Sequence, residues 1–174
     1  MVYCNRDGVL IRDMRWDDAQ AIADAEAAQG WAPNLEKYQR RLRDQSSGDA
    51  ISLTAEYHGE IAGYINLYLH PGDGPFAGQG YPEIVDFGVL EKYRRKGIGS
   101  RLMDAAEQLA AWYADTVYLG VGLHSGYGSA QRMYVKRGYI PDGTGVWYNG
   151  RPCDPYAECC NNDDLILYLS KRLR

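Results

Sequence analysis

Short apolar segments alternate along the chain with segments whose apolar residues recur at helical spacing. Apolar runs, several with period-two alternation, predict seven strands. These cover residues 9–12, 50–57, 60–70, 83–90, 116–121, 147–148 and 165–169. Helical spacing predicts four helices, which begin at Trp16, after Pro33, at Ile98 and at Ser129. Strands and helices therefore interleave along the whole chain.

The residues at the helix ends support this assignment. Asp17, with Gln20 three residues later, predicts the cap that begins the first helix. Gly30 is expected to end that helix, and Gly138 to end the fourth, because glycine readily adopts the left-handed conformation there. On the third helix, one apolar face is predicted by a regular stripe: Ile98, Leu102, Ala105, Leu109 and Trp112.

The order of the elements favours an α/β or α+β fold with a mixed central sheet. The chain has 174 residues, without internal repeats or a domain linker, and residues 71–82, PGDGPFAGQGYP, form a glycine-rich loop that is a surface connection or, alternatively, a lid over a site. A chain of this length can bury one sizeable core. We therefore expect a single domain over residues 1–174.

Charge and hydropathy narrow the partners that the chain can bind. The formal net charge is -4, so no overall field attracts nucleic acid or an anionic membrane surface. Acidic residues interrupt every apolar run before it reaches the length of a membrane-spanning helix. We expect no nucleic-acid or membrane partner, and either a monomer or a homodimer is compatible with the sequence.

The four cysteines indicate a cytoplasmic protein with reduced thiols rather than a disulfide framework. The N-terminal residues do not show the pattern of a secretory signal. Cys153, Cys159 and Cys160 could bind zinc only together with a distant histidine, and their spacing is wrong for a zinc knuckle. No metal is therefore expected.

The first candidate binding segment follows the strand at 83–90. It has the sequence RRKGIG, residues 94–99, and precedes a helix. The first turn of a helix has backbone N–H groups without intrahelical partners, and the helix dipole adds positive charge there. Gly97 and Gly99 let the backbone approach a bulky anion closely. Three basic side chains add full charges, although such a cluster can also be a solvated turn. The pattern favours a site for a pyrophosphate group.

Residues 94–99 match neither the G-x-G-x-x-G nor the G-x-x-x-x-G-K-[ST] pattern of nucleotide-binding proteins. They resemble the pyrophosphate loop [RQ]-x-x-G-x-[GA] of the GNAT superfamily of N-acetyltransferases. Residues 130–139, AQRMYVKRGY, are similar to that family's later helix and turn. The gap between the two motifs holds one helix and one strand, as in the family. The resemblance implies a GNAT-like mixed sheet of about seven strands flanked by about four helices.

The resemblance also implies acetyl-CoA as co-substrate and indicates which residues bind it. Backbone N–H groups from Arg95 to Ser100 would hold the pyrophosphate, and the strand from Phe87 to Val89 would pair with the pantetheine arm. The Val89 N–H would stabilise the oxyanion that forms on the thioester carbonyl. The implied cofactor-binding residues are Phe87, Gly88, Val89, Arg94, Arg95, Lys96, Gly97, Ile98, Gly99, Ser100, Ser129 and Tyr134.

Two catalytic roles follow from the resemblance. Tyr134 lies where the family's general-acid tyrosine falls, four residues before Gly138. Its apolar helix neighbours are also compatible with an ordinary core tyrosine. Glu83 is the candidate base, on the same strand face as Val89 if the alternation is regular, and a bulge would favour Asp86 instead. A solvent-exposed charge at the strand edge is the alternative for either carboxylate.

One position departs from the family pattern. An asparagine that often contacts the pantetheine is replaced here by Tyr127. Ser125 or Ser129 could take its place, although Ser129 at a helix start is also a typical cap. His124, in the same loop, is a second base candidate or an ordinary exposed histidine.

The predicted function is transfer of an acetyl group from acetyl-CoA to a primary amine of a small molecule or peptide, by direct attack. No cysteine lies in the matched motifs as a nucleophile. A CoA-binding sensor without turnover is the alternative, and a nucleotide-binding protein a third. Aromatic and acidic residues offer a site for a cationic acceptor. These are Trp31, Tyr38, Phe76, Trp147, Tyr148, Glu158, Asp163 and Asp164.

Overall fold

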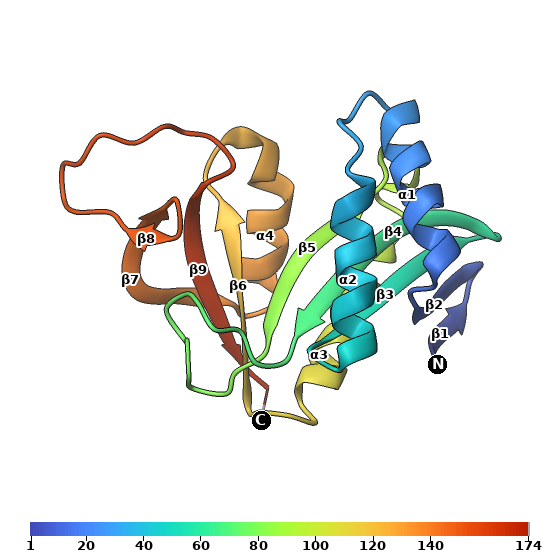
Figure 1. Ribbon diagram of the computed structural model, residues 1–174, viewed down its shortest axis with the longest axis horizontal. Helices are drawn as coiled ribbons and strands as arrows, with labels where there is room; N and C mark the ends of the chain where they lie inside the picture. Colours follow the sequence, from blue (N-terminus) through green and yellow to red (C-terminus); the bar gives the residue numbers. More distant parts are fainter. Residues whose placement is uncertain (174) are drawn as a thin grey trace. The chain divides into compact units, whose positions relative to one another are not determined.

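The computed structural model describes residues 1–173 and contains four α-helices and nine strands within them (Figure 1). The helices are α1 (Trp16–Ala28), α2 (Leu35–Ser47), α3 (Ile98–Ala110) and α4 (Gly128–Lys136). The strands are β1 (Val2–Arg6), β2 (Val9–Asp13), β3 (Ala50–Tyr57), β4 (Glu60–Tyr68), β5 (Glu83–Val89), β6 (Thr116–Gly122), β7 (Ile140–Tyr148), β8 (Arg151–Pro152) and β9 (Leu165–Arg172). The fold is therefore mixed α/β.

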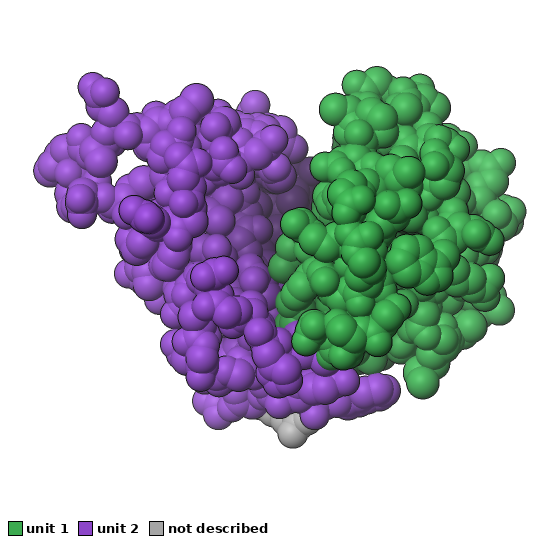
Figure 2. Space-filling model, in the orientation of Figure 1, with its two compact units in different colours: residues 1–68, 85–109 green, residues 69–84, 110–174 purple. Residues whose placement is uncertain are grey.

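The chain forms two compact units, coloured separately in Figure 2. Unit 1 contains residues 1–68 and 85–109, and unit 2 contains residues 69–84 and the chain from residue 110 onward. The boundary falls within β5, whose first two residues belong to unit 2 and whose remainder belongs to unit 1. Both ends of this strand carry predicted site residues.

Unit 1 is an antiparallel meander of β1 to β4, extended by β5. Helices α1 and α2 pack on it, and their apolar faces close a core over β4. On β4, Gly63 brings the strand close to its neighbour and to α3, since an added Cβ would lie 2.6 Å from the Gly88 carbonyl oxygen and 3.3 Å from Leu102 Cδ1. The core residues are Met14, Ala19, Ile22, Ala23, Tyr38, Leu42 and Tyr64.

Unit 2 combines one parallel pair with antiparallel strands. The start of β5 pairs in parallel with β6 through Glu83 opposite Tyr118. Strand β6 then pairs antiparallel with β9, which pairs antiparallel with β7, and β8 forms a short hairpin with β7. The aromatic core of this unit is built from Tyr118, Trp147 and Tyr168.

The sheet has more strands than the seven that the sequence pattern predicts. Strand β1, with the sequence VYCNR, has no fully buried residue and pairs with β2, and its sequence shows no period-two apolar pattern. Strand β8 has only two residues. Strand β7 begins at Ile140 rather than near Trp147, because the glycine-rich segment before Trp147 continues the strand with a shift of register. The predicted order of the other elements is confirmed.

Three predictions about helix ends are wrong. The N-cap residue of α1 is Arg15 rather than Asp17, and Asp18, the third residue of the helix, accepts the Arg15 N–H at 2.7 Å. Ser129 lies inside α4, whose N-cap residue is Tyr127. Helix α3 ends at Ala110, so Trp112 lies outside the apolar stripe and is exposed. The ends at Gly30 and Gly138 are confirmed by positive φ angles of 84° and 88°.

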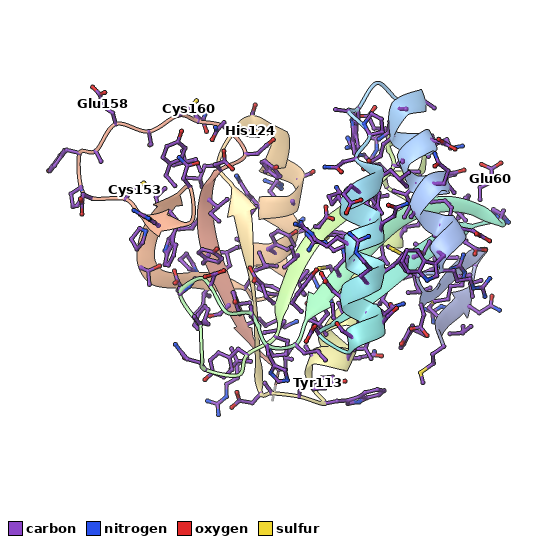
Figure 3. The ribbon with its side chains drawn as sticks, viewed as in Figure 1. Glu60, Tyr113, His124, Cys153, Glu158 and Cys160 are labelled. Atoms are coloured by element: carbon purple, nitrogen blue, oxygen red, sulfur yellow. The ribbon has the colours of Figure 1, made fainter. Side chains whose placement is uncertain are left out.

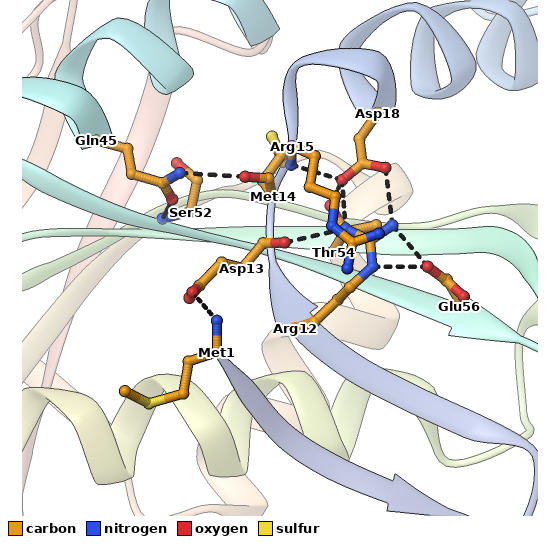
Figure 4. A network of polar contacts seen from close by, with 10 residues as sticks. All are labelled: Met1, Arg12, Asp13, Met14, Arg15, Asp18, Gln45, Ser52, Thr54 and Glu56. Atoms are coloured by element: carbon orange, nitrogen blue, oxygen red, sulfur yellow. Dashed lines mark hydrogen bonds and ion pairs between the residues drawn. The ribbon is translucent and has the colours of Figure 1, made fainter.

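A buried ion network joins β2, α1 and β3 in unit 1 (Figure 4). The Arg12 guanidinium donates to both carboxylate oxygens of Asp18, at 2.6 and 2.8 Å, and to Glu56 at 2.7 Å. The Thr54 hydroxyl donates to Asp18 at 3.1 Å. Burial raises the pKa of Asp18, but these hydrogen bonds outweigh it, and the pKa lies below its usual value.

We expect Asp18→Asn to lower the free energy of unfolding by about 3 kcal/mol at pH 7, because it leaves Arg12 buried with a weakened partner. The depressed pKa of Asp18 means that its contribution is present above about pH 4 and is lost as the pH falls further. Urea unfolding at pH 7 and pH 3, with exposed Asp17→Asn as the charge-matched control, measures this. An equal difference between wild type and Asp18→Asn at both pH values contradicts the prediction.

Candidate active site

The predicted pyrophosphate loop connects a short 3-10 turn, Glu91–Tyr93, to the start of α3 in unit 1. Two of its residues have left-handed backbone angles, with φ of 62° at Arg95 and 78° at Gly97. Alternation of left-handed and right-handed residues turns successive N–H groups toward one side of a loop and forms an anion-binding concavity. Arg95 and Gly97 provide the left-handed residues of such a concavity, as the predicted anion site requires.

The start of α3 adds N–H groups to the same concavity. Within the helix, the Arg101 N–H bonds to the Gly97 carbonyl at 3.2 Å. Helical geometry leaves the N–H groups of Ile98 and Gly99 without an intrahelical partner. A Cβ placed on Gly97 would meet no atom within 4 Å, so the space in front of the backbone is open. A pyrophosphate fits this arrangement of donors and open space.

The three basic side chains of the loop differ in their surroundings. Arg94 stacks over Trp31 at 5.6 Å, and Lys96 lies 5.0 Å from the centre of the Tyr57 ring. Arg95 is exposed, and its side chain contacts no charged or aromatic group among residues 1–173. Aromatic contacts thus hold two of the charges near the loop, while the third is available to a ligand.

Strand β5 contains an irregularity at Asp86, whose φ is 54°. Lys37 Nζ lies 3.0 Å from Asp86 Oδ1, and Arg41 Nε lies 3.6 Å from Oδ2. The Asn66 side chain donates to the carbonyls of Val85 and Asp86 at 3.3 and 3.1 Å. Regular alternation therefore does not hold through this strand, and Asp86 turns toward two cations of α2.

Gly88, two residues later, allows Tyr64 to pack directly against the strand. A Cβ at this position would lie 2.9 Å from the Tyr64 hydroxyl oxygen, closer than real side chains approach. The Tyr64 hydroxyl in turn donates to the buried Glu26 carboxylate at 2.8 Å. Buried contacts from α1 and β4 therefore fix the backbone between Phe87 and Val89.

Glu83, at the start of β5 in unit 2, lies opposite Tyr118 of β6. The Tyr118 hydroxyl donates to Glu83 Oε2 at 3.3 Å. Burial, and then the Glu83 charge, raise the pKa of Tyr118 above its usual value. Tyr118 therefore remains a protonated donor at neutral pH, and Glu83 is a half-buried carboxylate with a defined orientation.

Tyr134 lies on α4 with only 6% of its surface exposed, and its ring packs 5.9 Å from that of Tyr139. Burial, with a smaller effect of Tyr127, raises the pKa of Tyr134. Its hydroxyl has no hydrogen-bond partner among the described residues. Tyr134 is thus protonated at neutral pH and can donate its proton to a ligand.

The loop before α4 is held by Asp163, which lies before β9. His124 Nε2 and the Tyr127 hydroxyl are 2.9 and 2.8 Å from the Asp163 carboxylate (Figure 3 labels His124). His124 Nδ1 accepts the Gly126 N–H at 3.1 Å. Both ring nitrogens of His124 are therefore engaged, which argues against a role as base. The Tyr127 phenol bonds to a carboxylate and is no substitute for an amide.

The residues that were predicted to bind the acetyl acceptor lie in different parts of the structure. Phe76 and Trp147 belong to the aromatic core of unit 2, whereas Tyr38 is fully buried in unit 1 and donates to Glu26. Glu158 lies on the long loop between β8 and β9, where it is exposed (Figure 3). Trp31 contacts Arg94 of the pyrophosphate loop. Phe76 and Trp147 share one cluster, and the residue after Tyr148 donates its N–H to the Asp164 carbonyl.

Sequence reasoning missed two residues of the site. Tyr118 lies in an apolar run, which predicts an ordinary core residue. Its contact with the Glu83 carboxylate follows from the pairing of β5 with β6. Asn66 is completely buried within the apolar strand β4. A buried amide in an apolar strand needs hydrogen-bond partners, which is a signal that the sequence does contain.

Residues 1–173 contain no disulfide, no group of metal-binding side chains and no helix that could span a membrane. Cys4, Cys153, Cys159 and Cys160 are free thiols. Within the described residues, no three His, Cys, Asp or Glu side chains form a group that could hold a metal ion. No helix within residues 1–173 is long and apolar enough to cross a membrane.

Residues 11–139 match the sequence model of the acetyltransferase (GNAT) family, well over half of the chain. The chain therefore belongs to this family.

Among curated proteins, the chain is similar to mycothiol acetyltransferase from Nocardia farcinica (strain IFM 10152). The identity is 38% over 96 residues, which is 55% of this chain and 28% of that protein. The aligned part thus spans less than a third of the length of this relative.

Solved structures share the fold over nearly the whole chain. Ard1 from Thermoplasma volcanium has a TM-score of 0.68 at 19% identity, covering 95% of this chain and 97% of that one. The yncA protein from Salmonella typhimurium, solved with its cofactor acetyl-CoA, has a TM-score of 0.67 at 17% identity, covering 97% and 95%. The Escherichia coli ribosomal-protein-S18-alanine N-acetyltransferase has a TM-score of 0.67 at 11% identity, covering 95% and 94%. The predicted GNAT fold is confirmed.

Proposed function

We propose that this chain transfers the acetyl group of acetyl-CoA to a primary amine of a small molecule, by direct attack in a ternary complex. The left-handed residues Arg95 and Gly97 before α3 carry this proposal. Their left-handed angles orient backbone N–H groups at the start of a helix, where such groups can hold the pyrophosphate of CoA. Membership of the acetyltransferase family supports the same ligand.

Acetyl-CoA would supply an activated thioester carbonyl, and the chain's residues would hold and polarise it. N–H groups from Arg95 to Ser100 would bind the pyrophosphate, with Arg94 and Lys96 adding charge near it. The Phe87–Val89 backbone would pair with the pantetheine arm, and the Val89 N–H would donate to the carbonyl oxygen. Ser129, inside α4, is proposed as a further contact of the pantetheine. These assignments rest on the motif and on the fixed backbone of β5.

The geometry favours Glu83 over Asp86 as the base. Asp86 is bound to Lys37 and close to Arg41, so its carboxylate is already neutralised by two cations. Glu83 contacts the neutral Tyr118 hydroxyl instead. A carboxylate held by two cations is a poor acceptor for the proton that an ammonium group must lose before it attacks, which favours Glu83.

Tyr134 is proposed as the acid that protonates the departing thiolate. Its buried hydroxyl is protonated at neutral pH and has no partner among the described residues, as this role requires. The four cysteines lie outside residues 83–139, which contain both motifs. The motifs therefore offer no thiol nucleophile, and the amine itself would attack the thioester.

Two measurements test this function. Calorimetry should show that acetyl-CoA binds and that ATP at the same concentration does not. Release of free CoA thiol should require an amine from a panel of polyamines, aminoglycosides and amino acids. Binding of acetyl-CoA without thiol release for any amine would indicate a CoA sensor, and preferential binding of ATP would refute the cofactor assignment.

Substitution of Gly97 tests the loop directly. We expect Gly97→Ala to raise the Kd for acetyl-CoA about tenfold, because a Cβ disfavours the left-handed conformation by about 1–2 kcal/mol and shifts the N–H groups. Gly48→Ala is the matched control, since Gly48 is also left-handed and its Cβ position is also open. Calorimetry on both variants checks this, and equal acetyl-CoA affinities in the two variants would refute the assignment of the loop.

A further inference from the structure

The segment before β5, residues 70–82, is rich in glycine and lies against the aromatic core of unit 2. The Phe76 ring packs on Tyr118 with centroids 4.7 Å apart. Tyr118 and Tyr168 are 6.1 Å apart, and Trp147 packs edge-on against Tyr168 at 5.2 Å. Four aromatic side chains from the loop, β6, β7 and β9 thus meet in one cluster.

The polar ends of two of these side chains converge below the loop. A Cβ added to Gly74 would lie 3.5 Å from the Tyr168 hydroxyl oxygen and 3.8 Å from that of Tyr118. Tyr118 donates its hydroxyl hydrogen to Glu83. The Tyr168 side chain is mostly buried, and its hydroxyl has no hydrogen-bond partner among the described residues. The hydroxyl oxygen is not one of the fully enclosed atoms without a partner, so it can bond to a ligand or to water.

The electrostatic environment of this cluster is negative. Burial, then Glu83, Asp142 and Asp73, raise the pKa of Tyr168 to about 12. Glu83 and Asp73 act in the same direction on Tyr118. The three charged side chains that raise these pKa values are carboxylates. Carboxylates beside aromatic rings are the environment that stabilises an ammonium group.

We infer that this cluster binds a second ammonium group of the acetyl acceptor, so that the preferred acceptor is a di- or polycationic amine. The inference rests on the proposed function, in which Glu83 takes the proton of the reacting amine. The second ammonium would then donate to the Tyr168 hydroxyl and to Asp73, on the exposed loop beside it. A monoamine would lack these contacts, and an amine bearing a carboxylate would be repelled.

The tyrosines and Trp147 also form the hydrophobic core of unit 2, and a purely structural role is the alternative. The two roles differ in what Asp73 does. Asp73 is exposed and lies outside the core cluster, so its charge would not contribute to a purely structural role of the cluster. Under the inference, the Asp73 carboxylate favours acceptors with two positive charges over acceptors with one.

The test compares three acceptors of equal chain length: an α,ω-diaminoalkane, the corresponding monoamine, and the ω-amino acid. We expect kcat/KM for the diamine to exceed that for the monoamine about tenfold, with the amino acid poorest. Asp73→Asn should reduce the diamine-to-monoamine ratio toward one while leaving kcat/KM for the monoamine and the KM for acetyl-CoA unchanged. Asp115→Asn, at the turn before β6, removes the same charge from unit 2 and should preserve the ratio.

Tyr168→Phe provides a second variant that keeps the ring and removes only the unpartnered hydroxyl. It should lower the ratio several-fold without changing the melting temperature by more than a few degrees. A ratio unchanged in both Asp73→Asn and Tyr168→Phe, or a preference for the ω-amino acid, would overturn the inference.

Binding of the diamine to the protein saturated with CoA, measured by calorimetry, separates failure of this inference from failure of the proposed function. If acetyl-CoA is not bound or consumed at all, the proposed function fails. If acetyl-CoA is consumed and diamine binding does not weaken in Asp73→Asn, only the charge recognition fails. Weaker diamine binding in Asp73→Asn than in Asp115→Asn supports the inference.

Discussion

Tyr134→Phe is expected to lower kcat for acetyl transfer about 100- to 10,000-fold, the range typical of losing a general acid. The ring stays and keeps its packing against Tyr139, so the loss concerns the proton alone. Because burial raises the pKa of Tyr134, the wild-type enzyme should keep its donor above the ordinary tyrosine pKa of about 10. Steady-state kinetics from pH 6 to pH 10 measures both effects.

Tyr139→Phe is the matched control for this substitution. Tyr139 is also buried and lies five residues further along the same motif, so the same atom is removed from a similar environment. Its kcat should stay within a few-fold of wild type, whatever happens to its stability. A Tyr134→Phe enzyme with the full rate at every pH contradicts the acid assignment, and Tyr134 would then be a core residue.

Glu83→Gln is expected to lower kcat/KM for the amine about 100-fold or more at pH 7, since the protonated acceptor loses its base. The deficit should shrink as the pH rises toward the pKa of the amine, because more acceptor is then already neutral. The KM for acetyl-CoA should not change. A pH profile of kcat/KM for one amine, in wild type and variant, measures this directly.

Asp86→Asn is the comparison that makes this result specific. Asp86 binds Lys37 and lies near Arg41 at the irregular point of β5, so its substitution should lower stability. It should not reproduce the pH-dependent loss of rate. If Asp86→Asn shows the larger deficit at neutral pH and Glu83→Gln behaves as wild type, the base has been assigned to the wrong carboxylate.

Much of the fold follows from local signals in the chain. Gly30 and Gly138 end their helices through left-handed angles, and Asn34 caps α2 by accepting the Lys37 N–H. The failures have physical causes. Strand β1 is stabilised by pairing with β2 rather than by apolar side chains, which leaves no period-two pattern. Asp17 and Asp18 both lie in the first turn of α1, after the N-cap residue Arg15, and only Asp18 accepts the Arg15 N–H and contacts buried Arg12.

The candidate site shows a similar division. Backbone-based features, such as the anion loop at Gly97, depend on residues close in sequence and can be predicted from them. Features that depend on strand register cannot. The choice between Glu83 and Asp86 depends on the left-handed angle at Asp86 and on the cations of α2. The contact of Tyr118 with Glu83 depends on a parallel pairing between residues 35 positions apart.

The proposed transfer of an acetyl group from acetyl-CoA directly to an amine is tested most directly by a single-turnover experiment. It uses excess protein, isotopically labelled acetyl-CoA and a diamine, followed by mass spectrometry. The predicted result is acetylated amine and free CoA that form at the same rate, with no acetyl group on the protein and nearly no product in Tyr134→Phe. Acetyl-CoA that binds but remains intact with every amine, or a protein-bound acetyl group that precedes the product, would contradict it.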